Sequence, residues 1–229
     1  MGIPAMQPGD WARALRAACT PVLDAIDWSR PFTDDSGNTR EIDGQLIAWH
    51  RGVRPAPPPP PPPDASADVA LWHALACGAD AARVDEVLAR GREGTRTAWG
   101  GDAGALLPQV GTAIEVWTET ELAALHALWW LARHHDRDDW RGLIDGAVTW
   151  HLENSQPDNA TAHPWALHLF ALRGVGRGLG RGEAGPDGDP GARLYAETML
   201  HNCQVSLGRP DRLSALILAD AARAMEVER

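Results

Sequence analysis

The chain has 229 residues, 44% of them hydrophobic, a formal net charge of −10 and no lysine, so its 21 cationic side chains are all arginine. A general nucleic-acid binder or a protein of anionic membrane surfaces needs a positive surface, and the absence of any basic run argues against both classes. The missing lysine excludes Schiff-base chemistry and P-loop hydrolysis of nucleoside triphosphates, because both depend on a lysine side chain.

Residues 1–54 predict an irregular N-terminal segment that contains short helices. The stretch 8–19 has the apolar spacing of a helix, with Asp10 as its expected N-cap. Pro21 is expected to end this helix, because proline lacks the amide hydrogen that an interior position donates. Residues 41–53 (EIDGQLIAWHRGV) are the best strand candidate of the chain.

Residues 55–64 include seven consecutive prolines and predict a polyproline II linker. Such a rod can serve as a ligand for an aromatic-lined groove on a partner, or as a stiff spacer. We favour the spacer, because few charged residues flank the prolines to set the orientation of a bound partner. The linker would separate residues 1–54 from a helical domain over 65–229.

Two helices are expected directly after the linker. The first covers 66–78, with Ser66 or Asp68 as its cap and Gly78 as its end. The second follows over 80–90 and is expected to end at Gly91, which makes a helical hairpin with a very short turn. The Gly-rich stretch 91–112 receives no assignment.

The stretch 118–173 is the densest part of the chain in tryptophan and histidine, with five of the eleven tryptophans and six of the nine histidines. It predicts three consecutive helices. The first begins with a capping box at Thr118–Glu121, the second covers 138–154, and the third begins near His163 with Pro164 in its first turn.

The C-terminal part predicts one more helical hairpin. Residues 174–191 are glycine-rich and are expected to form a flexible surface insertion. Helices are expected over 192–206 and 210–227, the latter with Pro210 at its first position. A faint similarity between 138–144 and 211–217 suggests that paired helices repeat along the chain.

These elements predict an all-α protein, a stack or partial α/α toroid of helical hairpins preceded by a short irregular segment. The helix–turn–helix units of 118–229, with Trp and Leu on their inner faces, resemble the α/α-toroid proteins, which include terpene cyclases, prenyltransferases and many glycan-acting enzymes. The run Asp136–Asp139 also matches the Asp-x-Asp-Asp motif of class II terpene cyclases, although its place at a helix–helix turn favours N-capping. The resemblance implies an architecture and carries no catalytic residue across.

A full toroid would need more helices than this chain predicts. The core must therefore stay open, be smaller, or be completed by a second copy, so a homo-oligomer is one expectation. The unknown partner is otherwise a small molecule or a protein.

The candidate site is the polar loop around residues 156–163 together with the neighbouring histidines and tryptophans. A tryptophan plane beside Asp, Asn and His is typical of ligand pockets, sugar sites among them. The same residues could instead make the turn, cap the helix or lie in the core, and we favour these structural roles for most of them. The candidate acid–base residues are Asp158, His163, His168 and His151, and the candidate ligand contacts are Trp165, Asn159, Trp129 and His126.

None of the histidine spacings matches a known metal-ligand pair, so no metal site and no cofactor is expected. Two functions remain open: a helical-repeat binding module that uses a concave surface, which we favour, and a small α/α enzyme acting on a glycan or an isoprenoid-like substrate. Three widely spaced cysteines, no signal-peptide pattern and no membrane-length apolar segment favour the cytoplasm.

Overall fold

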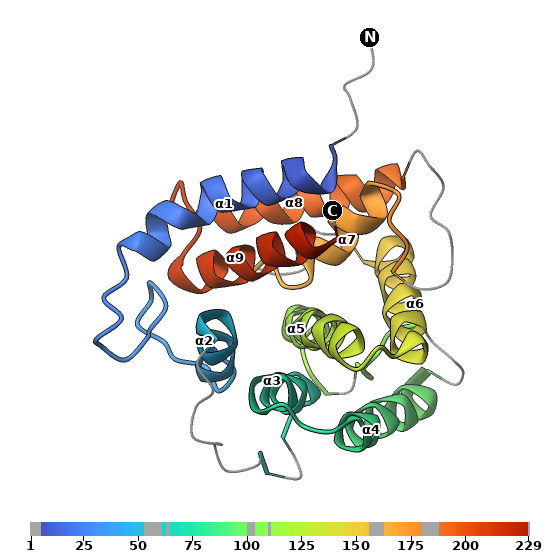
Figure 1. Ribbon diagram of the computed structural model, residues 1–229. Coiled ribbons are helices and arrows are strands. Elements are labelled where there is room, and N and C mark those ends of the chain that lie inside the picture. Colours follow the sequence, from blue (N-terminus) through green and yellow to red (C-terminus); the bar gives the residue numbers. More distant parts are fainter. Residues whose placement is uncertain are drawn as a thin grey trace. The chain divides into compact units, whose positions relative to one another are not determined.

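The computed structural model describes residues 6–52, 61–62, 65–99, 104–109, 111–155, 163–179 and 188–228. Within these ranges the protein contains nine α-helices and no strand, so the predicted all-α class is confirmed (Figure 1). None of the described helices combines the length and the apolar character needed to cross a bilayer. The arrangement of the helices as a stack or partial toroid stays a prediction.

Contacts divide the chain into two compact units. Unit 1 comprises residues 1–39 and 162–229, and unit 2 comprises residues 40–161. The first 39 residues therefore share a unit with the C-terminal helices, whereas the predicted domains place the boundary at the prolines 55–64. Of the predicted linker, only residues 61–62 are described, and of the predicted insertion 174–191, residues 180–187 lie outside the described ranges.

Unit 1 is built from four helices: α1 (Pro8–Asp24), α7 (Leu167–Gly174), α8 (Pro190–Val205) and α9 (Arg212–Val227). Helix α1 lies along α9, and α7 packs against α8 (Figure 1). The rings of Phe170 on α7 and Tyr195 on α8 stack with their centroids 4.2 Å apart.

Helix α1 is longer than predicted, because it continues through Pro21 to Asp24. Its N-cap is Gln7, and Asp10 is the third residue of the helix, where it completes a capping box with Gln7. The buried residues of α1, among them Trp11 and Leu15, form one stripe, and this helix packs on α9. Burial of such a stripe outweighs the single hydrogen bond that a proline removes.

Two other helices of unit 1, α7 and α9, begin at residues that differ from the predicted ones. Helix α7 begins at Leu167 rather than near His163, after Ala166 in the left-handed region with φ 57°. Pro210 precedes α9 instead of opening it, because Asp211 is the N-cap and accepts a hydrogen bond from the Ser214 amide at 2.6 Å.

Unit 2 is built from five helices: α2 (Asp43–Arg51), α3 (Ala67–Cys77), α4 (Ala81–Trp99), α5 (Ile114–His134) and α6 (Asp138–Asn154). Helix α3 packs against α2, α4 and α5, and α6 packs against α5. The predicted bounds of α6 are confirmed, and so is the end of α3 at Gly78, which adopts φ 66°. Helix α4 continues past Gly91, where the prediction ended it.

The predicted strand 41–53 is wrong, because these residues form α2. The Asp43 carboxylate accepts a hydrogen bond from the Arg40 amide at 2.8 Å and so stabilises the first turn. Ile42 and Leu46 are buried one helical turn apart, and Gly52 ends the helix with φ 63°. A short apolar run with this spacing fits both a strand and a helix, and burial on one helical face selects the helix.

The predicted capping box at Thr118–Glu121 is also wrong. Helix α5 begins one turn earlier, at Ile114, so both residues lie inside the helix. Their side chains are buried, and Glu121 has no exposed surface at all. The carboxylate that the sequence assigns to the helix start is therefore inside unit 2.

Gly174 tests the close packing of α7 on α8. A Cβ atom at this position would lie 2.9 Å from the backbone N and Cα atoms of Arg193. We expect Gly174→Ala to lower the free energy of unfolding by about 1–3 kcal/mol, because backbone atoms must shift. Gly142 on α6 is the matched control, since a Cβ there meets nothing within 4 Å.

Gly142→Ala should raise the free energy of unfolding by about 0.5–1 kcal/mol through the better helix propensity of alanine. Urea unfolding followed by circular dichroism measures both variants. Equal stabilisation by the two substitutions would contradict the close approach of α7 and α8.

Candidate functional site

The described residues include six of the eight predicted site residues, since Asp158 and Asn159 lie outside them. Three belong to unit 1 and three to unit 2. All six are buried, with exposed fractions between 0% and 7%. They are His163, Trp165, His168, His126, Trp129 and His151.

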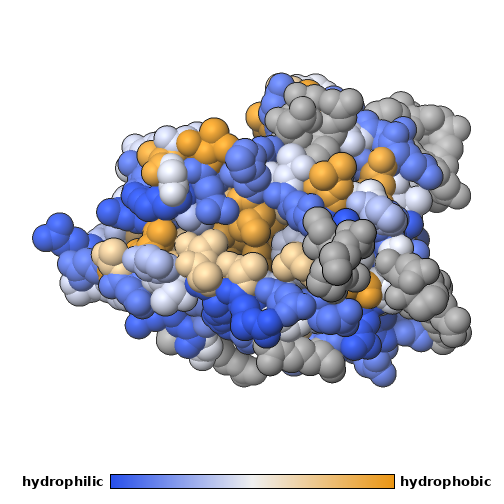
Figure 2. Space-filling model, turned by 90° about the horizontal axis from the view of Figure 1, so that it is seen from above, coloured by the Kyte–Doolittle hydropathy of each residue, from blue (hydrophilic) through white to orange (hydrophobic). Residues whose placement is uncertain are grey.

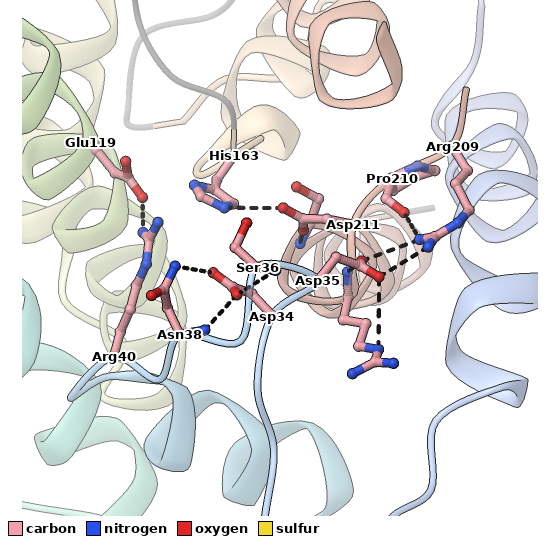
Figure 3. A network of polar contacts seen from close by, with 12 residues as sticks. Asp34, Asp35, Ser36, Asn38, Arg40, Glu119, His163, Arg209, Pro210 and Asp211 are labelled. Atoms are coloured by element: carbon pink, nitrogen blue, oxygen red, sulfur yellow. Dashed lines mark hydrogen bonds and ion pairs between the residues drawn. The ribbon is translucent and has the colours of Figure 1, made fainter. Parts of the chain in front are cut away.

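In unit 1, the His163 side chain contacts the N-cap residue of α9, Asp211. Its Nε2 atom lies 3.4 Å from Oδ2 of Asp211 (Figure 3). Burial alone would raise the pKa of Asp211, but hydrogen bonds from His163 and from the Ser214 amide outweigh burial and lower it. Asp211 therefore stays ionised and caps the start of α9, and the His163 side chain contacts this cap.

Trp165 and His168 are fully buried in the same unit, immediately before and within α7. In unit 2, the rings of His126 and Trp72 lie 5.5 Å apart, and those of Trp129 and Trp130 lie 4.7 Å apart. All four side chains are buried in the cores of their units.

In unit 2, His151 lies beside a buried carboxyl group. Its Nε2 atom is 3.9 Å from Oε1 of Glu121, and its ring stacks on Trp117 with centroids 5.9 Å apart. Nδ1 is 3.1 Å from the Ser155 hydroxyl, which itself donates to the His151 carbonyl oxygen. Because the Ser155 hydroxyl donates to the carbonyl oxygen, the tautomer with a proton on Nδ1 fits these two contacts.

Glu121 is the residue that sequence reasoning missed. Its two carboxyl oxygens accept hydrogen bonds from the backbone amides of Leu106 (2.6 Å) and Leu107 (2.8 Å). Burial raises its pKa to about 8, although the two amide donors act in the opposite direction. Burial also lowers the pKa of His151 to about 4. Glu121 and His151 are therefore both largely neutral near pH 7.

Glu121 holds in place an irregular segment that is itself buried. Residues 104–109 form no helix, yet Leu106 and Leu107 are almost fully inaccessible. Gly91 on α4 allows this close approach, because a Cβ atom there would lie 3.2 Å from the Leu106 carbonyl oxygen. The indole Nε1 of Trp117 donates to the Leu107 carbonyl oxygen at 3.2 Å.

This arrangement forms one wall of a pocket in unit 2, here called the α4–α5 pocket. Its volume is about 360 Å³, within the range of small-molecule sites. Most of its lining is apolar, and the polar side chains are one guanidinium and two hydroxyl groups. The lining residues used below are Val87, Arg90, Leu107, Pro108, Trp117 and Thr120.

Unit 1 contains a second pocket, here called the α1–α9 pocket, of about 370 Å³. Helix α1 supplies an apolar floor, and the rim carries Asp35, Arg209 and Arg212. Neither of these two pockets is lined by any of the six described candidate residues.

The Asp-x-Asp-Asp run is occupied by ion pairs. Arg141 pairs with Asp136 (2.8 Å) and Asp138 (2.6 Å), and Arg137 pairs with Asp139 (2.6 Å). Arg137 also pairs with Asp85 at 3.0 Å. Within the described ranges, no three His, Cys, Asp or Glu side chains are grouped as a metal site requires.

The molecular surface also carries exposed hydrophobic residues. Figure 2 shows hydrophilic residues around several separate hydrophobic areas. The exposed large hydrophobic residues are Ile114 and Val116 of α5, Leu194 and Val205 of α8, Leu207, and Val227 of α9. Scattered exposure of this kind is normal for protein surfaces, so the two pockets are the stronger candidates.

Replacing Glu121 tests whether its hydrogen bonds to the buried segment 104–109 stabilise the protein. Glu121→Gln puts an amide NH₂ group in place of one acceptor, so one buried backbone amide loses its partner. We expect the free energy of unfolding to fall by about 1–3 kcal/mol. Glu153→Gln, at an exposed position on α6, is the control and should change it by less than about 0.5 kcal/mol. Equal effects in urea unfolding at pH 7 would contradict the role of Glu121.

The pH dependence of stability provides a separate test. The pKa of Glu121 rises from 4.5 to about 8 on folding, so its contribution is lost as pH rises through about 8. The pKa of His151 falls from 6.5 to about 4, so its contribution is lost as pH falls through this range. The two effects oppose each other below pH 6.5, and above it only Glu121 acts.

The free energy of unfolding should therefore decrease between pH 6.5 and 8, by at most about 1.4 kcal/mol per pH unit from this group. Glu121→Gln should lack that decrease. Urea titrations of both proteins across this range measure it, and identical slopes would show that Glu121 does not titrate there.

No family model, no curated protein and no solved structure matches the chain. The case for a function therefore rests on the two pockets and on the residues that build them.

Proposed function

We propose that the protein is a non-catalytic binding module and that unit 2 takes a small, largely apolar ligand in the α4–α5 pocket. The observation that carries this proposal is the pocket itself, with Trp117 and Leu107 in a wall that buried hydrogen bonds hold in place. A pocket that is formed before the ligand arrives requires little ordering of side chains on binding, which favours affinity.

The side chains that line the pocket indicate which kind of ligand fits it. Val87, Leu107 and Pro108 offer apolar contacts, and Trp117 contributes part of its indole to the lining. Arg90 and Thr120 add a guanidinium and a hydroxyl group, so a ligand with one or two polar groups suits the pocket better than a highly hydroxylated sugar.

Glu121 and His151, which do not line the pocket, contact the residues that form its wall. Thr120 and Trp117 line the pocket from α5, and Glu121 is the next residue of that helix, bonded to the backbone of the segment that carries Leu107. His151 packs against the Trp117 ring. Glu121 and His151 therefore act on the pocket through the residues that line it.

The alternative, an α/α enzyme with histidine acid–base residues, receives less support. His126, His151 and His168 have no exposed surface, and His163 is paired with Asp211. An acid–base residue must come within hydrogen-bonding reach of the substrate, and the described parts of both pockets bring none of these side chains to the lining.

The binding proposal can be tested with 1-naphthol, a flat apolar probe that carries one hydroxyl group. Saturation-transfer NMR should detect its binding to the wild-type protein, and a titration should give its Kd. Thr120→Phe fills part of the pocket and should weaken binding by about tenfold or more, which is about 1.4 kcal/mol. A cooperative thermal transition would confirm that the variant is folded.

Thr198→Phe is the matched control. Thr198 and Thr120 each donate a side-chain hydrogen bond to the carbonyl oxygen four residues earlier, but Thr198 lies on α8 of unit 1. It should leave the Kd unchanged. No binding by the wild type, or equal binding by both variants, would contradict the assignment of the ligand to this pocket.

A further inference from the structure

The α1–α9 pocket lies in the other unit and does not depend on the proposed ligand of unit 2. Its floor is a stripe of small apolar residues on α1, which leaves room above the helix: Ala17, Ala18, Pro21, Val22 and Ala25. A short alkyl chain fits this floor by size and chemistry, because each floor residue offers carbon atoms and no side-chain polar group.

The rim of the pocket carries charge. Asp35 accepts hydrogen bonds from both terminal nitrogens of Arg209, at 3.2 Å and 2.9 Å, and from the Arg212 backbone amide at 2.9 Å (Figure 3). Arg209 also donates to the Pro210 carbonyl oxygen at 2.8 Å. Asp35 and its partners thus fix Arg209 in one position at the rim.

The Arg212 side chain is held less completely. Its Nε atom lies 3.9 Å from Oδ1 of Asp35, and the side chain is 44% exposed. Among the described residues, neither of its terminal nitrogens, Nη1 and Nη2, makes a hydrogen bond. These two groups form the edge of a guanidinium that pairs with a carboxylate in the usual two-point geometry.

The charge of the lining selects the kind of anion. The lining residues contain two guanidinium groups and one carboxylate, so their net charge is +1. Hydrogen bonds from Arg209 lower the pKa of Asp35 and keep it ionised. The Asp35 carboxylate would repel a dianion such as phosphate more strongly than it repels a single carboxylate.

We propose that the α1–α9 pocket binds a small monocarboxylate, whose carboxylate pairs with Arg212 and whose short aliphatic chain lies on α1. Asp35 is a positioning residue in this site, because it fixes Arg209 and disfavours ligands of higher charge.

Pentanoate and its neutral isostere pentanamide separate charge recognition from apolar contact. Isothermal titration calorimetry at low ionic strength should detect pentanoate binding to the wild-type protein at millimolar concentrations, and pentanamide and inorganic phosphate should each bind at least about tenfold more weakly. Equal binding of pentanamide or tighter binding of phosphate would overturn the monocarboxylate assignment, and so would the absence of pentanoate binding.

Two variants locate the site. Arg212→Gln keeps the backbone amide that Asp35 holds and removes the guanidinium, so it should weaken pentanoate binding by about tenfold or more. Ala17→Phe, at an exposed position of α1, should obstruct the floor and have a similar effect. Arg13→Gln is the control, because Arg13 is on α1, is 74% exposed and does not line the pocket.

The pattern of the variants decides the outcome. Loss of binding in Arg212→Gln and Ala17→Phe, with binding retained in Arg13→Gln, supports the proposal. Wild-type affinity in Arg212→Gln, or equal loss in all three, would place pentanoate elsewhere or make it a non-specific anion. Binding of 1-naphthol to the Arg212→Gln protein reports on unit 2 alone, so the two proposals can fail separately.

Discussion

The pair of hydrogen bonds between Glu121 and the amides of Leu106 and Leu107 is the constraint on which the candidate site in unit 2 depends. A buried segment without regular secondary structure has backbone amides that no helix or sheet satisfies, and leaving them unpaired is unfavourable. The carboxyl group supplies two acceptors at once. With the segment fixed, Trp117 can bond to it, and the wall of the α4–α5 pocket is complete.

The burial of Glu121 beside this segment explains why its carboxyl group has a raised pKa. Burial without a cationic partner favours the neutral acid, so its pKa rises to about 8, and the neighbouring His151 is kept neutral by its own burial. Two neutral groups can lie side by side in a core without the desolvation penalty of an ion pair. His151 contacts both Glu121 and the ring of Trp117, which lines the pocket.

The sequence predicts the helical class and some helices well, and its errors have physical causes. Helix α6 is predicted correctly because a stripe of buried residues recurs at helical spacing, and α3 ends where Gly78 can adopt a left-handed conformation. The sequence predicts a strand where α2 forms, because a short apolar run fits either structure. The start of α5 was missed because Thr118–Glu121 has the composition of a capping box although both side chains are buried.

The candidate site was harder to predict than the fold. Histidines are candidate site residues because imidazole is a common acid–base group. Whether a side chain is exposed, however, depends on tertiary packing that no short motif encodes. Both pockets are built from residues far apart in the chain, such as Val87, Leu107 and Trp117. One signal was present: Glu121 lies on the same helical stripe as Trp117, Leu125 and Leu128, and a charged residue on an apolar stripe indicates a buried polar contact.

The order of the two units along the chain has a consequence for biosynthesis. Residues 40–161 are translated between the two parts of unit 1, so α1 leaves the ribosome long before α9, the helix that covers its apolar face. Unit 2 consists of one continuous segment and can fold as soon as that segment has been synthesised. Trp11 and Leu15 of α1, in contrast, need residues of α9 that are synthesised later. The apolar stripe of α1 can therefore be buried against α9 only after residues 212–227 have been synthesised.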